Sequence, residues 1–450
     1  MLKKTLSAIL AILAVSAVLT GCAATGGSGN PSGQTVTSAV TTDSATESVT
    51  EESQAETSAE TEDPAIIGDG ELISEQFEEL DYVGAAETSS IKHTAEMIDM
   101  LSGTEHQNVI ISPTSLDMAM GMLFAGANDN ALDALSEYYN TTAENKADRD
   151  SKLIAAYNKY KNAEVLLSNA VYLNSDYSLT DTYADTVREK YKADVQSLDF
   201  KDAASADVIN KFCADSTKDK ITEIVKPETL LNKSSVILNA LYFNAKWEDE
   251  FTKENVDENT DFTNGDGTIS KVTGMSEHAR MGYYETESAK AFAKSYKGYD
   301  FSFIGILPDE SIIDENKNFK MSDIDIDALL TTGESKEVDI MLPKFKLEDM
   351  NGLNDCLKAQ GLEEIFEANG YFKAMSPADF FVSDVLQKVV IEVDEKGTEA
   401  AAITAIMTMD AAAAPDPEEP KSVILNRPFI FMIYDNVNSE PLFIGKITKL

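Results

Sequence analysis

The 450-residue sequence predicts an α+β fold. Segments with helical spacing of apolar residues come mainly first, and most segments with strand character follow them. This order, without regular alternation of strands and helices, favours α+β over a doubly wound parallel sheet. The sequence shows no internal repeat, and 43% of its residues are apolar, which is enough for a substantial core.

The first residues have the pattern of a secretion signal. Lys3 and Lys4 precede an apolar run, Leu6 to Leu19, that is shorter than the about 20 residues of a membrane-spanning helix. The Thr-Gly-Cys that ends at Cys22 resembles the lipobox of bacterial lipoproteins. That resemblance implies cleavage before Cys22, acylation of its thiol and amine, and anchoring on the extracellular face of the bacterial envelope. An ordinary signal with a coincidental cysteine is the alternative.

Residues 22–85 are predicted to form an acidic, disordered tether. From Ala23 to about Ala65 almost nothing is apolar, so burial cannot offset the entropy cost of ordering. Some forty residues of this kind have a root-mean-square reach of about 35–40 Å. We therefore expect a signal peptide over residues 1–21, acylated Cys22 with a linker to residue 85, and a folded domain over residues 86–450.

The charge of the chain excludes several classes of partner. The net charge is −41, and fifteen Asp or Glu but no Lys or Arg lie between Ala23 and Ser90. Because a polyanion would be repelled, we expect no binding to nucleic acid or heparin. Membrane contact is expected only through the lipid anchor.

The elements of the folded domain follow from hydrophobic periodicity. Helices are expected at 91–101, 115–125 and 206–225, and strands at 108–111, 165–173, 236–243, 301–307, 338–341, 389–393, 429–434 and 442–447. Pro113 lies near the start of the second helix, where proline costs little. The strands at 165–173 and 236–243 are apolar at odd and even positions alike, which predicts central strands covered on both faces. The segment Asn264–Gly267 is a turn signal.

Residues that carry enzyme or metal chemistry are sparse. The cysteines form no C-x-x-C pair, and no histidine has a second His or Cys close by in the sequence. No G-x-S-x-G or phosphate-binding loop is present. We therefore expect no metal, no cofactor and no enzyme activity. Cys213 and Cys356 are interpreted as two separate buried thiols, with a disulfide between them as the alternative. The cysteines and histidines of the chain, considered as metal ligands or catalytic groups, are Cys22, Cys213, Cys356, His93, His106 and His278.

The most informative segment follows the strand at 389–393. It continues through Gly397 into an alanine-rich run over residues 400–414 and ends in a proline-rich stretch at 415–420. Alanine has the highest helix propensity, so this segment alone is compatible with an ordinary helix and a proline-rich exit.

Several separated stretches resemble the serpin family of serine protease inhibitors. They are Asn108–Ser115 with Ala125–Ala127, Leu238–Trp247 with the only Trp, Leu342–Phe345, Gly397–Ala402, and Asn426–Phe429 with Pro441–Gly445. Their order and spacing over about residues 86–450 match the family, and together they are highly specific. The resemblance implies a serpin fold of three β-sheets with about nine helices. It also implies an exposed reactive-centre loop from roughly Glu395 to Lys421.

The resemblance implies a single-use trap acting on a serine protease, and a monomeric inhibitor. The protease would attack the loop and form an acyl-enzyme, after which the freed loop would insert as a strand into the large sheet. An inserted strand buries alternate side chains. From Thr398 these are small or β-branched and carry no charge. The inward set is Thr398, Ala400, Ala402, Thr404 and Ile406.

The resemblance also assigns individual residues. The hinge comprises Gly397, Thr398, Glu399, Ala400, Ala401 and Ala402. The cleaved bond is expected between Ala411 and Ala412, with cleavage after Met409 or Asp410 as alternatives, which suits an elastase-like or subtilisin-like protease. Polar residues where the central strands part are Ser112, Ser115, Asn239 and Gln387, the last at a position where the family often has His, and Trp247 is expected near the hinge. The alternative functions are a non-inhibitory serpin-fold surface protein for binding or adhesion, and a hydrolase.

Overall fold

The computed structural model describes residues 90–103, 107–315, 318–379, 381–398 and 419–450. These residues belong to one compact unit. Among the assigned residues, Cys22, Glu399–Ala402 and 409–412 lie outside the described ranges, so their predicted roles stay predictions. In the described part of the chain, no helix has the length and apolar character needed to span a membrane.

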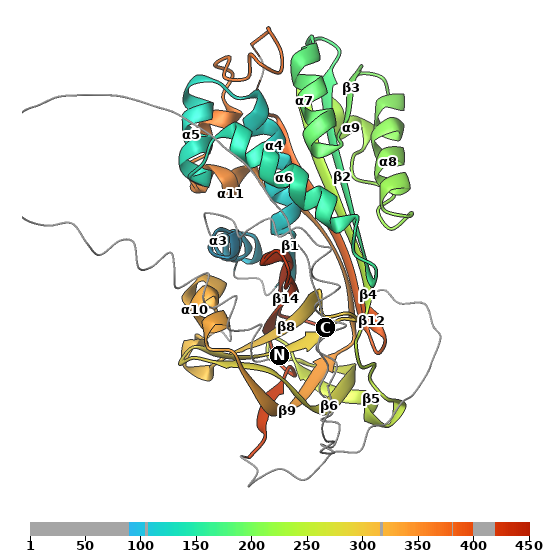
Figure 1. Ribbon diagram of the computed structural model, residues 1–450, viewed down its shortest axis with the longest axis vertical. Helices are drawn as coiled ribbons and strands as arrows, with labels where there is room; N and C mark the ends of the chain where they lie inside the picture. The colour runs from blue at the N-terminus through green and yellow to red at the C-terminus, as the bar shows by residue number, and fades with distance from the viewer. Residues whose placement is uncertain (1–89, 104–106, 316–317, 380, 399–418) are drawn as a thin grey trace, which may run out of the picture. The chain divides into compact units, whose positions relative to one another are not determined.

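The long strands of a six-stranded sheet run along the length of the described domain (Figure 1). Its strands, in spatial order, are β10 (Phe345–Gly352), β11 (Asp384–Asp394), β12 (Gly397–Thr398), β4 (Ser235–Lys246), β2 (Ala163–Asn174) and β3 (Asp194–Leu198). Strands β2 and β4 pair antiparallel from Ala163 opposite Ala245 to Leu173 opposite Ser235. Strands β11 and β4 run parallel, and they lie at the centre of the sheet.

The remaining strands form a nine-stranded sheet. These are, in order, β1 (Val109–Ile111), β15 (Glu440–Ile447), β14 (Phe429–Asp435), β8 (Phe301–Pro308), β7 (Ala289–Ser295), β6 (Ile269–Glu285), β9 (Glu334–Pro343) and β13 (Lys421–Ile424), with β5 (Val256–Thr263) paired to β6. The three expected sheets are therefore two hydrogen-bonded assemblies. The reason is the 17-residue strand β6. It pairs with β5 and β9 and, near its end, with β7, so two of the three expected sheets are joined into one.

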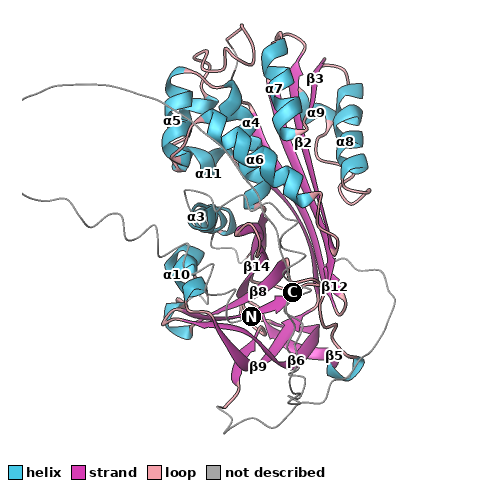
Figure 2. Ribbon diagram, viewed as in Figure 1, coloured by secondary structure: helices cyan, strands magenta, loops and turns pink. Residues whose placement is uncertain are grey.

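Nine α-helices occur among the described residues (Figure 2). They are α3 (Ser90–Ser102), α4 (Pro113–Gly126), α5 (Asp129–Tyr139), α6 (Ala143–Tyr157), α7 (Asp181–Tyr191), α8 (Ala204–Ser216), α9 (Pro227–Leu230), α10 (Ile326–Thr331) and α11 (Asn354–Ala359). Short 3-10 helices lie at Lys253–Asn255, Glu310–Ile312, Met321–Asp323 and Glu363–Phe366. Helix α4 begins where Ser112 caps it, accepting a hydrogen bond from the Ser115 amide, and Pro113 takes a first-turn position.

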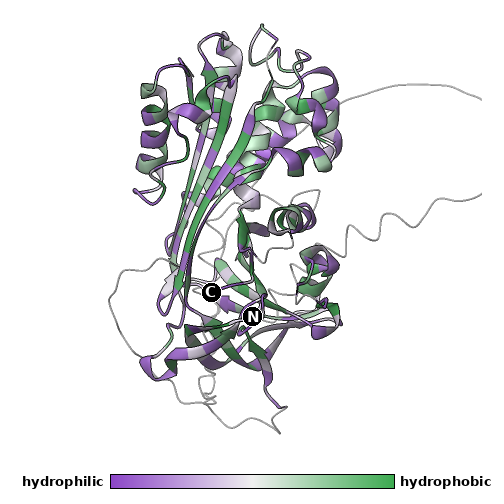
Figure 3. Ribbon diagram, turned by 180° about the vertical axis from the view of Figure 1, so that it is seen from behind, coloured by the Kyte–Doolittle hydropathy of each residue, from purple (hydrophilic) through white to green (hydrophobic). Residues whose placement is uncertain are grey.

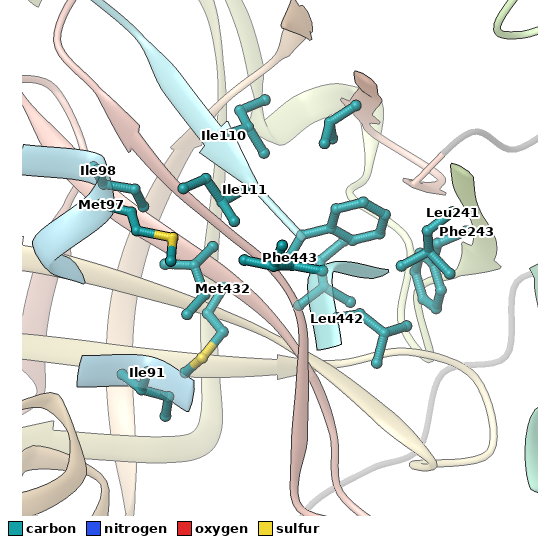
Figure 4. Packing of buried hydrophobic residues seen from close by; sticks show 14 of the residues in the cluster. Ile91, Met97, Ile98, Ile110, Ile111, Leu241, Phe243, Met432, Leu442 and Phe443 are labelled. Carbon is teal, nitrogen blue, oxygen red and sulfur yellow. The ribbon is translucent and has the colours of Figure 1, made fainter. Parts of the chain in front are cut away.

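Strands β2 and β4 are covered on both faces, as their sequences predict. Even-numbered residues such as Tyr172 and Leu238 pack in a cluster with Ile209 and Cys213 of α8. Odd-numbered residues such as Leu241 face the main core. The hydropathy colouring shows apolar stretches along these strands (Figure 3). The main core gathers residues from distant segments, including α3, β1, β4, β14 and β15 (Figure 4).

The helix expected over residues 206–225 is wrong at its C-terminal end, because α8 ends at Ser216. Lys218 and Asp219 take positive φ angles of 54° and 61°, which the α-helix does not allow. The apolar residues beyond them still reach the core as a loop. Asn210 holds this loop, since its side-chain oxygen accepts hydrogen bonds from the amides of Ile224 and Val225.

Cys213 and Cys356 are both buried and both carry free thiols, so the interpretation as two separate thiols holds. They belong to different apolar clusters. Burial raises the pKa of the Cys213 thiol to about 12. Burial also raises the pKa of the Cys356 thiol, so neither thiol is set up as a nucleophile.

Candidate functional site

The site lies where β11 and β4 part in the middle of the large sheet. Near one end the strands pair directly, from Asp384 opposite Val236 to Gln387 opposite Asn239. At the other end β12 lies between them as a two-residue antiparallel strand. Between these ends, no pairing of β11 with β4 is found among the described residues. At one end of the opening β12 thus lies between β11 and β4, and at the other end β11 and β4 pair directly with each other.

Gly397 allows the chain to enter the sheet. Its φ of 155° is one that side-chain-bearing residues rarely adopt. A Cβ atom at this position would lie 2.2 Å from the backbone oxygen of Ala245 and 2.7 Å from Cα of Lys246. Only glycine fits this close approach without displacing β4.

Thr398 is the first hinge side chain inside the sheet, with 1% of its surface exposed. It pairs with Val393 on one side and Ala245 on the other. Its hydroxyl is 2.6 Å from the hydroxyl of Tyr296, and either group can donate this hydrogen bond. Thr398 therefore points inward, which is the parity that the sequence predicts for the inserted strand.

The turn from β11 into β12 is held by charged side chains. Asp394 accepts hydrogen bonds from the amides of Lys396 and Gly397, at 2.8 and 3.2 Å. Lys344 forms an ion pair with Glu395 at 2.9 Å. Although burial acts in the opposite direction, the hydrogen bond from Lys344 keeps the pKa of Glu395 below its ordinary value. Glu395 therefore stays ionised at neutral pH, and its ion pair with Lys344 fixes the turn that leads into the hinge.

Trp247 lies against this turn. Its indole Nε1 donates to the backbone oxygen of Asp394, and its amide donates to that of Lys396, both at 2.9 Å. The indole stacks on the ring of Tyr296, with centroids 4.4 Å apart and planes at 14°. The Phe251 amide donates to the Glu395 backbone oxygen at 2.9 Å. Trp247 and Phe251 thus hold, through its backbone, the turn that leads into the hinge.

At the opposite end of the opening, polar side chains connect five elements. The Ser112 backbone amide donates to Gln387 Oε1, and Gln387 Nε2 donates to the backbone oxygen of Ser112, both at 2.8 Å. Ser115 donates from its hydroxyl to Asn239 Oδ1, and Asn239 Nδ2 donates to Asn169 Oδ1. Asn169 in turn donates to the backbone oxygen of Tyr191 at 2.7 Å. The network links α4, β11, β4, β2 and the end of α7.

The structure brings Ser112, Ser115, Asn239 and Gln387 into one network and places Trp247 beside the hinge. Sequence reasoning missed Asn169 and Tyr296. Asn169 has a signal, because a polar residue in a strand covered on both faces needs a buried hydrogen-bond partner. Tyr296 has none, since only the fold brings it to residue 398.

The six-stranded sheet holds β12 between β11 and β4. The fold is therefore that of a protein whose large β-sheet accepts an additional strand at its centre. The sequence matches the family model described as "Serpin (serine protease inhibitor)" over residues 89–450, and the chain belongs to this family.

Two relatives match the chain over about three quarters of its length. It is 30% identical to leukocyte elastase inhibitor from Homo sapiens over 76% of this chain and 93% of that protein. It is also 30% identical to an uncharacterized serpin-like protein from Methanosarcina acetivorans, over 76% and 82% of the two chains. Each identity extends over most of the described domain.

Solved structures show the same fold. The native state of the thermophilic serpin tengpin is similar with a TM-score of 0.69 and 28% identity, covering 83% of this chain and 98% of that one. Thyroxine-binding globulin in complex with thyroxine has a TM-score of 0.67 and 21% identity, over 80% and 98% of the chains. The second likeness concerns the fold alone.

Proposed function

We propose that this protein is a single-use inhibitor of elastase-like or subtilisin-like serine proteases. After cleavage of the loop, the acyl-enzyme would be trapped as the loop adds a strand between β11 and β4. The observation that supports this most directly is the position of Gly397 and Thr398, which already pair with both strands. Insertion then extends an existing strand instead of starting a new one.

The residues that would follow Thr398 suit burial. Because Thr398 faces the core, the same parity in a continued strand gives Ala400, Ala402, Thr404 and Ile406. None of these is charged or a proline, so each can enter a strand that is covered on both faces. About fourteen residues at ~3.3 Å each span roughly 46 Å, which is enough to cross the sheet.

The proposed class of protease rests on the expected cleavage between Ala411 and Ala412. Small apolar residues at a cleaved bond suit a protease with a shallow apolar specificity pocket, and no Lys or Arg lies between Glu399 and Pro420. The similarity to leukocyte elastase inhibitor is consistent with this class. We further propose that the protein acts at the bacterial cell surface, held by acylated Cys22 and the acidic tether.

The test is a denaturing gel of the protein mixed with pancreatic elastase and, separately, with subtilisin. We expect a band near the summed masses and a released C-terminal peptide that starts at Ala412. Cleavage of the loop by both enzymes without such a band would contradict the proposal. It would favour a non-inhibitory role in binding or adhesion.

A further inference from the structure

A buried lysine contacts the two aromatic residues that hold the turn leading into the hinge. Lys294 of β7 is 5% exposed, and its ammonium donates to Glu277 of β6 at 2.5 Å. The ammonium also lies 4.5 Å from the ring centroid of Phe251 and 5.6 Å from that of Trp247. It therefore has one carboxylate partner and two aromatic neighbours.

The two rings near the ammonium belong to Trp247 and Phe251, which hold the turn that leads into the hinge. The Trp247 amide donates to the backbone oxygen of Lys396, and the Phe251 amide donates to that of Glu395. The two rings meet edge to face, with centroids 6.3 Å apart and planes at 90°. An ammonium near both rings favours one arrangement of the pair, because cation–π attraction is directional and strengthens as water is excluded.

A second path leads from the same ammonium to the inserted residue. Trp247 stacks on Tyr296, and the Tyr296 hydroxyl bonds to the Thr398 hydroxyl. Movement of the indole would therefore disturb both the turn at Asp394–Lys396 and the side chain of Thr398.

The burial of Lys294 carries a stability cost that an apolar side chain of similar length would avoid. A buried ion pair commonly stabilises a fold no more than well-packed apolar residues of similar volume do. The contacts of Lys294 therefore point to a positional role and not to general stability.

We propose that Lys294, oriented by Glu277, is a positioning residue that keeps the hinge docked between β11 and β4. The proposal rests on the proposed inhibitory function for its consequence, because a loosely docked hinge would insert more slowly. Slow insertion lets the protease complete hydrolysis, so more inhibitor is consumed as substrate for each protease trapped. The docking itself requires no inhibition and can be measured separately.

The test compares Lys294→Met with Lys290→Met, a half-buried lysine on the same strand without these ring contacts. In Lys294→Met we expect the amides of Trp247 and Phe251 to exchange hydrogen at least tenfold faster. Residues 429–435 of β14 serve as an internal reference and should keep their exchange rates. With elastase, the number of inhibitor molecules consumed per protease trapped should rise at least threefold. Lys290→Met should behave as the unmodified protein in both measurements.

A double variant in which the two charges are swapped distinguishes the effect of the ring contacts from that of the ion pair. Lys294→Glu combined with Glu277→Lys retains opposite charges but places a carboxylate against the aromatic faces. We expect this double variant to show the same fast exchange at residues 247 and 251 as Lys294→Met. Unchanged exchange in Lys294→Met would overturn the proposal, as would fast exchange spread equally over β14, which indicates general destabilisation. If the unmodified protein traps no protease, the proposed function fails, and the exchange measurement still decides the role of Lys294.

Discussion

Gln387 and Ser112 exchange two hydrogen bonds of 2.8 Å, with the Gln387 amide acting once as donor and once as acceptor. The bonds connect the start of α4 to the point where β11 and β4 still pair. Gln387 is 3% exposed, so its two hydrogen bonds are shielded from bulk water. This contact therefore ties β11 to the start of α4 beside the last residue pair of β11 and β4.

Replacing Gln387 by Ala should destabilise the protein by about 2–4 kcal/mol, because two buried backbone groups of Ser112 lose their partners. The measurement is the midpoint of urea unfolding followed by far-ultraviolet circular dichroism. The control is Gln196→Ala, whose side chain is exposed and bonds only to Asp194, two residues away. The control should shift stability by less than about 0.5 kcal/mol. Equal effects of the two variants would contradict the structural role of the Ser112 contact.

Replacing Gly397 by Ala should prevent the hinge from docking, because the new Cβ would lie 2.2 Å from the Ala245 oxygen. We expect less than half of the covalent complex with elastase that the unmodified protein forms, with a matching increase in cleaved inhibitor. Densitometry of denaturing gels gives both quantities. Gly352→Ala is the matched control, since nothing lies within 4 Å of a Cβ there. A Gly397→Ala variant that traps elastase as well as the control does would show that this close approach is unimportant.

Thr398→Arg tests insertion itself. An arginine at a position that is 1% exposed would bury an unpaired charge, so the loop should not insert and the protein should become a substrate. We expect complete cleavage by elastase and no covalent band on a denaturing gel. Thr398→Val serves as the control, because it keeps the volume and removes only the hydrogen bond to Tyr296. If Thr398→Arg still forms the covalent complex, trapping does not require insertion at this residue.

The sequence allowed much of this site to be anticipated, and the reasons differ between its parts. The central strands β2 and β4 were predictable because strands covered on both faces are apolar at successive positions. Helices α6 and α7 were not identified. In α6 the apolar residues gather at the C-terminal end, at 153–157, and in α7 only four of eleven residues are apolar, so the apolar signal of each helix is short or sparse. Lys294 could not be singled out either. Its neighbours Phe251 and Glu277 lie 43 and 17 residues away in the sequence, and only the fold brings them together.

The pH dependence of stability should reveal the buried carboxyl groups near the β14–β15 turn. Burial raises the pKa of Asp435 to about 6, even though hydrogen bonds from Asn438 and Tyr160 act in the opposite direction. Burial likewise raises the pKa of Glu440 to about 7. The folded state therefore binds protons more tightly than the unfolded state, and stability should fall as pH rises from about 4 to 7.

Asp435→Asn should remove the share of this slope that lies between about pH 4 and 6, which amounts to at most about 3 kcal/mol for a pKa shift of this size. The measurement is urea unfolding at intervals from pH 4 to 8, comparing slopes because the substitution also changes the hydrogen bonds of the turn. Asp266→Asn is the control. The pKa of Asp266 is lowered to about 2 by hydrogen bonds from Thr268, so its contribution is lost only below about pH 4. The control should keep the full slope above pH 4, and an Asp435→Asn variant with the same slope would mean that Asp435 does not titrate in this range.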